Sequence, residues 1–127
     1  MKDSASIKGT QSVSRVSGTV LKGAKRGRAL GYPTANIPLL GSTLSGVYAA
    51  KVTVRAGEAP HVAAVFADPA RGVLEAHLLD FSDDLYGMEI TVALHKKLRE
   101  SADFEGDAEL RKAIAQDIAS VREYFDL

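Results

Sequence analysis

Residues 21–37 combine glycines and cations in a spacing that suits the binding of an anion. Gly23, Gly27 and Gly31 recur every four residues, so the backbone can bend freely and lie close to a ligand. Four cations stand among these glycines, namely Lys22, Lys25, Arg26 and Arg28. This pattern predicts a phosphate-binding loop. Spacing alone also leaves open an ordinary turn flanked by solvated cations.

The residues directly after this loop could hold a metal ion. Pro33 fixes an extended backbone. Because side chains alternate in an extended segment, Thr34 and Asn36 point to the same side. A hydroxyl and a carboxamide oxygen suit Mg²⁺, which completes its coordination shell with water and substrate phosphates. We therefore predict a magnesium site at Thr34 and Asn36, beside the phosphate-binding loop.

A second candidate for chemistry is Glu75, in the predicted strand over residues 73–81. Alternation places Glu75 on the same, largely apolar face as Val73, His77, Leu79 and Phe81. A carboxylate at the rim of such a face, or partly removed from water, can accept a proton from a substrate. The alternative is a solvated glutamate on an edge strand, since carboxylates are rarely buried.

Two stretches resemble the signatures of the riboflavin kinase family. Residues 22–37 read Lys-Gly-Ala-Lys-Arg-Gly-Arg-Ala-Leu-Gly-Tyr-Pro-Thr-Ala-Asn-Ile and are similar to the first signature, whose Pro-Thr-Ala-Asn motif holds the Mg²⁺ of Mg-ATP. Residues 75–81 read Glu-Ala-His-Leu-Leu-Asp-Phe and, with Asp-Leu-Tyr-Gly at 84–87, resemble the second. In that signature the glutamate acts as base toward the ribityl hydroxyl, and Glu75 matches it. The resemblance extends from residue 16 to about residue 125.

The resemblance implies transfer of the γ-phosphoryl group of ATP to the terminal hydroxyl of riboflavin, which gives FMN and ADP with Mg²⁺ as cofactor. It implies that Thr34 and Asn36 hold the metal and that Glu75 orients the hydroxyl. Arg99 matches a Leu-Arg position near the family's flavin site. The nucleotide and its phosphates would lie against Lys22, Gly23, Lys25, Arg26, Gly27, Arg28, Gly31, Tyr32 and Pro33. The sequence contains neither a P-loop nor a Rossmann glycine motif that could hold ATP instead.

One loop departs from the family pattern. The family usually carries a longer loop resembling Asn-Ile-Gly-x-x-Pro-Thr, whereas residues 65–72 read Val-Phe-Ala-Asp-Pro-Ala-Arg-Gly and keep only the proline. The leading hypothesis is a stand-alone riboflavin kinase. A second is a catalytically impaired paralogue that binds flavin or nucleotide as a sensor or carrier. A third, a nucleic-acid-binding barrel, is disfavoured because only Tyr32 could stack near the basic residues.

Composition describes one ordinary globular domain without disulfides. The chain has 127 residues, 46% hydrophobic and 25% charged, with no cysteine. Lys plus Arg and Asp plus Glu both total 16, so the net charge offers no attraction to nucleic acid or to an anionic membrane. No apolar run is long enough to span a bilayer and the start has no signal region. We expect a cytoplasmic monomer whose partners are small molecules.

The elements that must position these residues are mostly strands. Residues 1–14 hold few apolar groups, which predicts a flexible tail before a barrel domain over 15–127. Strands are predicted over 15–20, 46–54, 61–66, 73–81 and 89–99, the last two joined as a hairpin through 83–87. A helix over about 107–124, with Asp107 as N-cap, is predicted from the apolar stripe Leu110, Ile114, Ile118, Val121 and Phe125. With the extended segment after Pro33 there are six or so short strands without intervening helices, so the chain is predicted to be mainly β, a six-stranded antiparallel closed barrel with a C-terminal helix.

Overall fold

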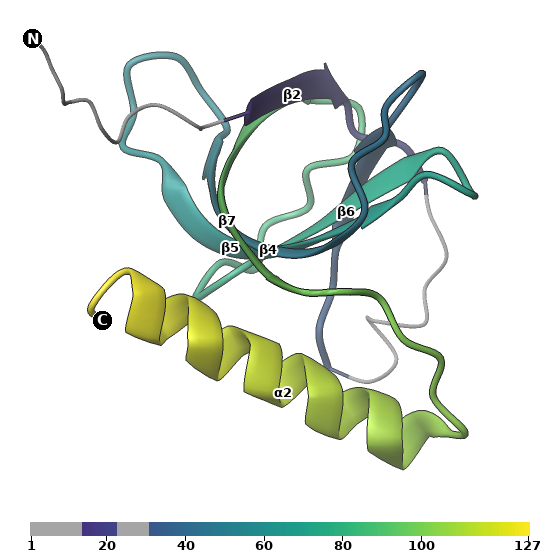
Figure 1. The fold of residues 1–127 in the computed structure, drawn as a ribbon. Helices are drawn as coiled ribbons and strands as arrows, with labels where there is room; N and C mark the ends of the chain where they lie inside the picture. Colours follow the sequence, from purple (N-terminus) through teal and green to yellow (C-terminus); the bar gives the residue numbers. More distant parts are fainter. Residues whose placement is uncertain (1–13, 23–30) are drawn as a thin grey trace, which may run out of the picture.

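The computed structural model describes residues 14–22 and 31–127, which form a curved antiparallel sheet with one helix along its outside (Figure 1). The six strands are β2 (Ser14–Thr19), β3 (Ala35–Pro38), β4 (Gly46–Thr53), β5 (His61–Asp68), β6 (Val73–Leu78) and β7 (Glu89–Arg99). The helix is α2 (Asp107–Tyr124). The predicted six-stranded antiparallel barrel with a C-terminal helix is confirmed. The predicted tail lies, apart from Ser14, outside the described residues and stays a prediction.

The sheet closes on itself at a narrow seam. Its strands follow the order β2-β7-β4-β5-β6-β3, so β2 and β3 are the two edges. Beyond β2, Leu21 pairs with Asn36 of β3 through a single bridge, in which the Leu21 N–H donates to the Asn36 carbonyl oxygen at 2.7 Å. Gly18 lies at the same seam, where a Cβ would stand 3.2 Å from the Ile37 Cβ. A residue without a side chain thus lets the two edges approach and the barrel close.

Side chains alternate between the barrel interior and its outer face. In β6, Leu74, Ala76 and Leu78 are buried, whereas Glu75 and His77 point outward and are half-buried. Fully buried aliphatic side chains from five strands fill the interior, among them Ile37, Val52, Val65, Leu74, Ile90 and Val92. The inner face of the barrel supplies stability, and its outer face is left free to carry polar groups.

The predicted hairpin through residues 83–87 is wrong. Strand β6 pairs with β5 and β3, while β7 pairs with β2 and β4. The connecting segment instead meets the end of β2, because Gly87 N–H donates to the Val20 carbonyl at 2.9 Å and Val20 N–H donates to the Met88 carbonyl at 2.8 Å. Leu85 is buried and anchors this path. Turn residues mark where a chain reverses, but they do not specify the strand that it meets afterwards.

The predicted N-cap of the helix is also wrong. The capping position is Gly106, which has an extended backbone, and Asp107 is the first helical residue. Glycine is well tolerated at an N-cap. Asp107 and Glu109 both lie in the first turn, where their negative charge is favourable next to the positive end of the helix dipole. Asp107 therefore marks the start of the helix as its first residue, one position after the N-cap.

Only the C-terminal half of α2 packs against the barrel. Val121 is fully buried with Ala49 and Leu79, and Ile118 is partly buried against them. Leu110 and Ile114 are half-buried and line a cleft, so only the second half of the predicted apolar stripe packs against the barrel. In the part of the chain that the structure describes, no helix combines the length and apolarity needed to cross a membrane.

Candidate active site

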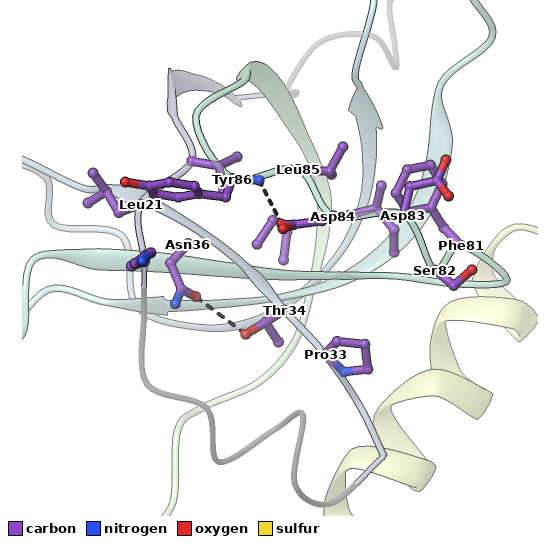
Figure 2. Close-up of a pocket in the computed structure, with 15 residues that line it drawn as sticks. Leu21, Pro33, Thr34, Asn36, Phe81, Ser82, Asp83, Asp84, Leu85 and Tyr86 are labelled. Atoms are coloured by element: carbon purple, nitrogen blue, oxygen red, sulfur yellow. Dashed lines mark hydrogen bonds between the residues drawn. The ribbon is translucent and has the colours of Figure 1, made fainter.

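Two clefts, each of about 320 Å³, meet at Thr34. The first, here called the polar cleft, is lined by Lys22, Asn36, Ser82, Asp83, Asp84 and Tyr86 among others (Figure 2). The second, here called the apolar cleft, is lined by Val47, Phe66, Glu75, Phe104, Leu110 and Ile114 among others. Thr34 lines both clefts. One of the two residues predicted to bind a metal is thus at their junction.

The two predicted metal ligands lie next to each other. The Thr34 Oγ1 hydroxyl donates to the Asn36 Oδ1 at 3.4 Å, and Asn36 is buried. Magnesium holds adjacent ligand oxygens roughly 2.9 Å apart, given bonds of about 2.0–2.1 Å. A shift of about half an ångström would let both oxygens serve one ion. The neutral donor pair therefore fits a metal that takes the rest of its shell from water and phosphate.

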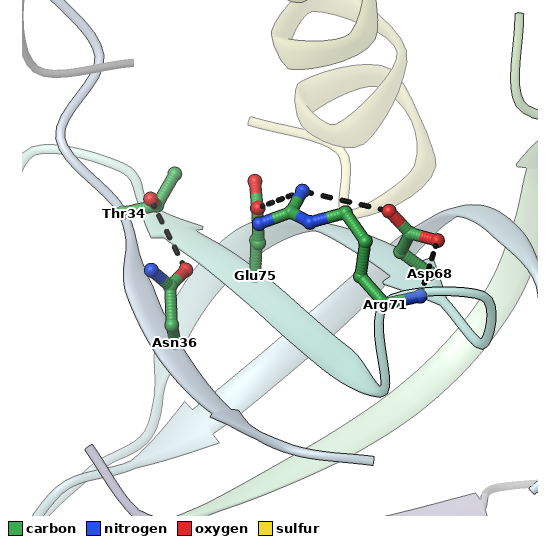
Figure 3. Close-up of polar contacts among 5 residues, drawn as sticks. All are labelled: Thr34, Asn36, Asp68, Arg71 and Glu75. Atoms are coloured by element: carbon green, nitrogen blue, oxygen red, sulfur yellow. Dashed lines mark hydrogen bonds and ion pairs between the residues drawn. The ribbon is translucent and has the colours of Figure 1, made fainter. Parts of the chain in front are cut away.

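Glu75 lies directly opposite Asn36 on the neighbouring strand. The two residues are Cα partners in the β3–β6 pair, so both side chains leave the same outer face (Figure 3). The Glu75 Oε2 accepts a hydrogen bond from Arg71 Nη1 at 3.0 Å, and the glutamate side chain is 21% exposed. The candidate base and the candidate metal ligands, predicted from separate stretches of sequence, are brought together by strand pairing.

The apolar surroundings predicted for Glu75 are only partly as expected. Strand β6 ends at Leu78, so the alternation does not continue to Phe81, which packs against the barrel core instead. Leu79 does lie on the outer side, where it packs with Val121 of α2. Most of the apolar wall near Glu75 comes from other elements, because α2 and the segment before it stand over this face.

The described part of the predicted phosphate-binding loop flanks both clefts. Lys22 lines the polar cleft with its Nζ 5.4 Å from the centre of the Tyr86 ring. Gly31 has φ +92°, a backbone conformation that favours glycine. Pro33 also lines the polar cleft, and Tyr32 lines the apolar cleft. The predicted sites Gly23, Lys25, Arg26, Gly27 and Arg28 lie outside the described residues.

His77 secures this loop to β6. Its Nδ1 lies 2.8 Å from the Pro33 carbonyl oxygen, and because a carbonyl can only accept, Nδ1 carries the proton. Its ring also meets the edge of Tyr32, with 5.6 Å between the ring centres. The backbone that leads into Thr34 is thus held against the strand that carries Glu75.

Arg99, predicted near the flavin site, does line the apolar cleft but is already paired. Its Nε and Nη2 donate to the two carboxylate oxygens of Asp117, each at 2.8 Å. The hydrogen bond to Asp117 raises the pKa of Arg99 above its ordinary value. Asp117 was not among the site residues predicted from the sequence. The available signal was an aspartate set inside an apolar helical stripe, three residues after Ile114 and four before Val121.

The described residues form a small antiparallel barrel with a candidate ligand site in two parts, which share Thr34. The chain belongs to the riboflavin kinase family, since its residues 10–125 match the family described as Flavokinase: Riboflavin kinase. It is 43% identical over 120 residues to the bifunctional riboflavin kinase/FMN adenylyltransferase of Escherichia coli (strain K12). That match covers 88% of this chain and 38% of the relative, so the chain spans well under half the length of that protein.

Two solved structures share this fold. A Streptococcus pneumoniae structure described as a macrolide-efflux protein matches with a TM-score of 0.71 and 28% identity, over 85% of this chain and 38% of that one. Riboflavin kinase from Trypanosoma brucei matches with a TM-score of 0.66 and 22% identity, over 93% of this chain and 83% of that one. At that identity the second match supports the fold alone.

Proposed function

We propose that this protein transfers the γ-phosphoryl group of ATP to the terminal ribityl hydroxyl of riboflavin, giving FMN and ADP. The observation that carries the proposal is the pairing of Asn36 with Glu75 across β3 and β6. This pairing sets a candidate base beside candidate metal ligands at the junction of two clefts of different character. Family membership supports the same reaction.

The polar cleft is the proposed nucleotide site. Lys22 offers a cation at its wall, and Thr34 and Asn36 present their oxygens where the cleft meets its neighbour. These two residues would hold Mg²⁺, which when bound neutralises charge on the β- and γ-phosphates. Gly31 and Pro33 shape the backbone on the phosphate side. The remaining loop residues, Gly23, Lys25, Arg26, Gly27 and Arg28, belong to this proposal from sequence alone.

The apolar cleft is the proposed riboflavin site. The flavin ring system is broad, flat and weakly polar, and side chains such as Phe66, Phe104 and Ile114 give it an apolar wall. Tyr32 and the Arg99–Asp117 pair lie at the same wall. The ribityl chain would then run toward Glu75, which lines this cleft and not the other.

Catalysis in this arrangement rests on position and charge more than on covalent chemistry. The hydroxyl oxygen forms a bond to the γ-phosphorus as the bond from that phosphorus to the β–γ bridging oxygen breaks. Because such transition states are loose, the base need only accept the hydroxyl proton as transfer proceeds. Glu75 takes that proton, and ADP leaves with the bridging oxygen.

The test is direct incubation of the purified chain with riboflavin, ATP and Mg²⁺, with the products separated by chromatography. We expect FMN and ADP in equal amounts, no FMN when EDTA replaces Mg²⁺, and no FAD. A chain that binds riboflavin and ATP but forms no FMN at high protein concentration would contradict the proposal and favour a flavin-binding paralogue. FAD among the products would reveal an activity that the described site does not account for.

A further inference from the structure

We propose that Arg71 leaves Glu75 and pairs with the phosphate of newly formed FMN, so that the apolar cleft holds the product more tightly than the substrate. The inference rests on the proposed function, because it takes riboflavin and FMN as the ligands of this cleft. It assigns a role to the turn between β5 and β6, where the chain departs from the family pattern.

The geometry gives Arg71 a fixed base and an accessible head. Its backbone N–H donates to Asp68 Oδ1 at 3.3 Å, and Gly72 N–H closes the turn by donating to the Pro69 carbonyl at 3.2 Å. Its Nη1 lies 3.0 Å from Glu75 Oε2 and 3.5 Å from Asp68 Oδ2 (Figure 3). Half of the Arg71 side chain is exposed. The guanidinium can therefore exchange partners while the turn stays in place.

The reaction changes the charge next to this guanidinium. Riboflavin arrives with a neutral hydroxyl at Glu75, whereas FMN carries a phosphate of about −1.5 to −2 charge, as for other phosphate monoesters at pH 7. That phosphate is bonded to the oxygen that Glu75 faced, so two anions lie side by side once Glu75 has released the transferred proton to solvent. A guanidinium that turns from Glu75 to the phosphate reduces this repulsion, since its fork of donors fits phosphate oxygens well.

The other described basic side chains near the clefts are less suited to this exchange. Of the described residues that line the apolar cleft, two are arginines, and the second, Arg99, has its Nε and Nη2 committed to Asp117 and its Nη1 to the Glu100 carbonyl. His77 lines the cleft as well, but its protonated Nδ1 is held by the Pro33 carbonyl. Lys22 lines the polar cleft only. Arg71 is therefore the cation that the geometry favours.

The experiment measures the affinity of the chain for riboflavin and for FMN by calorimetry, without nucleotide, in wild type, Arg71→Gln and Arg71→Lys. We expect wild type to bind FMN more tightly than riboflavin. Arg71→Gln should weaken FMN binding about tenfold, the value of one charge-assisted hydrogen bond, and change riboflavin binding less than twofold. Arg71→Lys should lie between the two, because lysine keeps the charge but not the fork of donors.

Arg122→Gln is the matched control. Arg122 is similarly exposed and donates to Asp80 at 3.2 Å, but it lines neither cleft. It should leave both affinities unchanged. The proposal is overturned if Arg71→Gln weakens riboflavin and FMN equally, which would give Arg71 a merely structural role, or if it weakens neither. These measurements need no turnover, so the two proposals can fail separately. If the wild type forms no FMN but Arg71→Gln still loses FMN binding selectively, only the kinase proposal is refuted. If the wild type is active and Arg71→Gln shows no such loss, only this inference is refuted.

Discussion

The two clefts have the same volume and share Thr34, yet most of their other lining residues come from different parts of the chain. The polar cleft is walled by residues 20–22, 33–36 and 81–86 at the seam of the barrel, together with Ala76 and Leu78 of β6. The apolar cleft is formed by the outer face of β5 and β6 together with α2 and the segment before it. Thr34, directly before the edge strand β3, is thus the residue at which a site for a charged ligand and a site for an apolar one would adjoin.

The largest effect should come from the point where the clefts meet. Glu75→Gln keeps size and hydrogen bonding but cannot accept the hydroxyl proton, so we expect kcat to fall by roughly two to four orders of magnitude. Binding of riboflavin and of Mg-ATP should change little. Steady-state kinetics with calorimetry on the same samples checks both. An unchanged kcat would remove Glu75 from the role of base and leave the enzyme class untouched.

The next effect should be confined to the apolar cleft. Ile114 is half-buried at its wall, so the charge in Ile114→Asp stays partly solvated and the protein should fold. We expect riboflavin affinity to fall by roughly ten- to a hundredfold, because a carboxylate then faces the flavin ring system. Mg-ATP binding should persist.

Val121→Asp provides the contrast on the same helix. Val121 is fully buried, so its replacement by an unpaired carboxylate should unfold the domain, with no cooperative melting transition left. If Ile114→Asp also abolished folding, the first half of α2 would be part of the core and the apolar cleft would lose its assigned wall.

A smaller effect, on the KM for Mg-ATP, is expected from a change in the polar cleft. Asn36→Ala removes one of the two oxygens proposed to hold the metal but keeps the backbone carbonyl that closes the barrel. We expect the KM for Mg-ATP to rise about tenfold or more, in the range typical of disturbed metal sites. Riboflavin affinity should stay within twofold of wild type. Equal weakening of both ligands in calorimetry would show that Asn36 supports the fold and not one cleft.

The smallest effect should concern neither cleft. His95 packs against Tyr124 and Phe125, with ring centres 6.1 Å and 5.2 Å apart. Burial lowers the pKa of His95 below its ordinary 6.5, and the charges of Lys51 and Arg15 lower it further. The unfolded chain therefore binds this proton more readily, so the contribution of neutral His95 to stability is complete above about pH 6.5 and is lost as the pH falls below it.

The melting temperature should accordingly decline slightly below this pH in the wild type, and less in His95→Gln. Riboflavin and Mg-ATP affinities at neutral pH should be the same in both proteins. A larger acid sensitivity in His95→Gln than in the wild type would contradict the direction of the pKa change.

Much of the fold could be predicted because alternation and helical periodicity are local properties of the sequence. The strands and α2 follow from them, and Thr34 and Asn36 share a side for the same reason. Which segments pair with each other is not a local property of the sequence. The segment 83–87 contains turn residues, but its position beside Val20 depends on the buried Leu85 and on hydrogen bonds that Gly87 and Met88 make with Val20.

The same limit applies to the site. The stripe on α2 predicts one apolar face, but whether Leu110 and Ile114 meet the barrel or line a cleft depends on how far the helix stands from the sheet. Asp117 could not be assigned a partner, since Arg99 lies 18 residues away and is brought close only by the path of the chain between β7 and α2. Sequence reveals which groups are present, and the tertiary path decides which of them meet.

Asn36 takes part in two events that are usually separate. Its backbone carbonyl receives the Leu21 N–H that seals the seam between the first and last strands of the sheet, and its side chain belongs to the candidate metal pair. Anything that immobilises Asn36 also favours the sealed state, because ligand binding and local opening are linked equilibria. The Leu21 amide is thereby a natural reporter, and its rate of hydrogen–deuterium exchange should slow as the site fills.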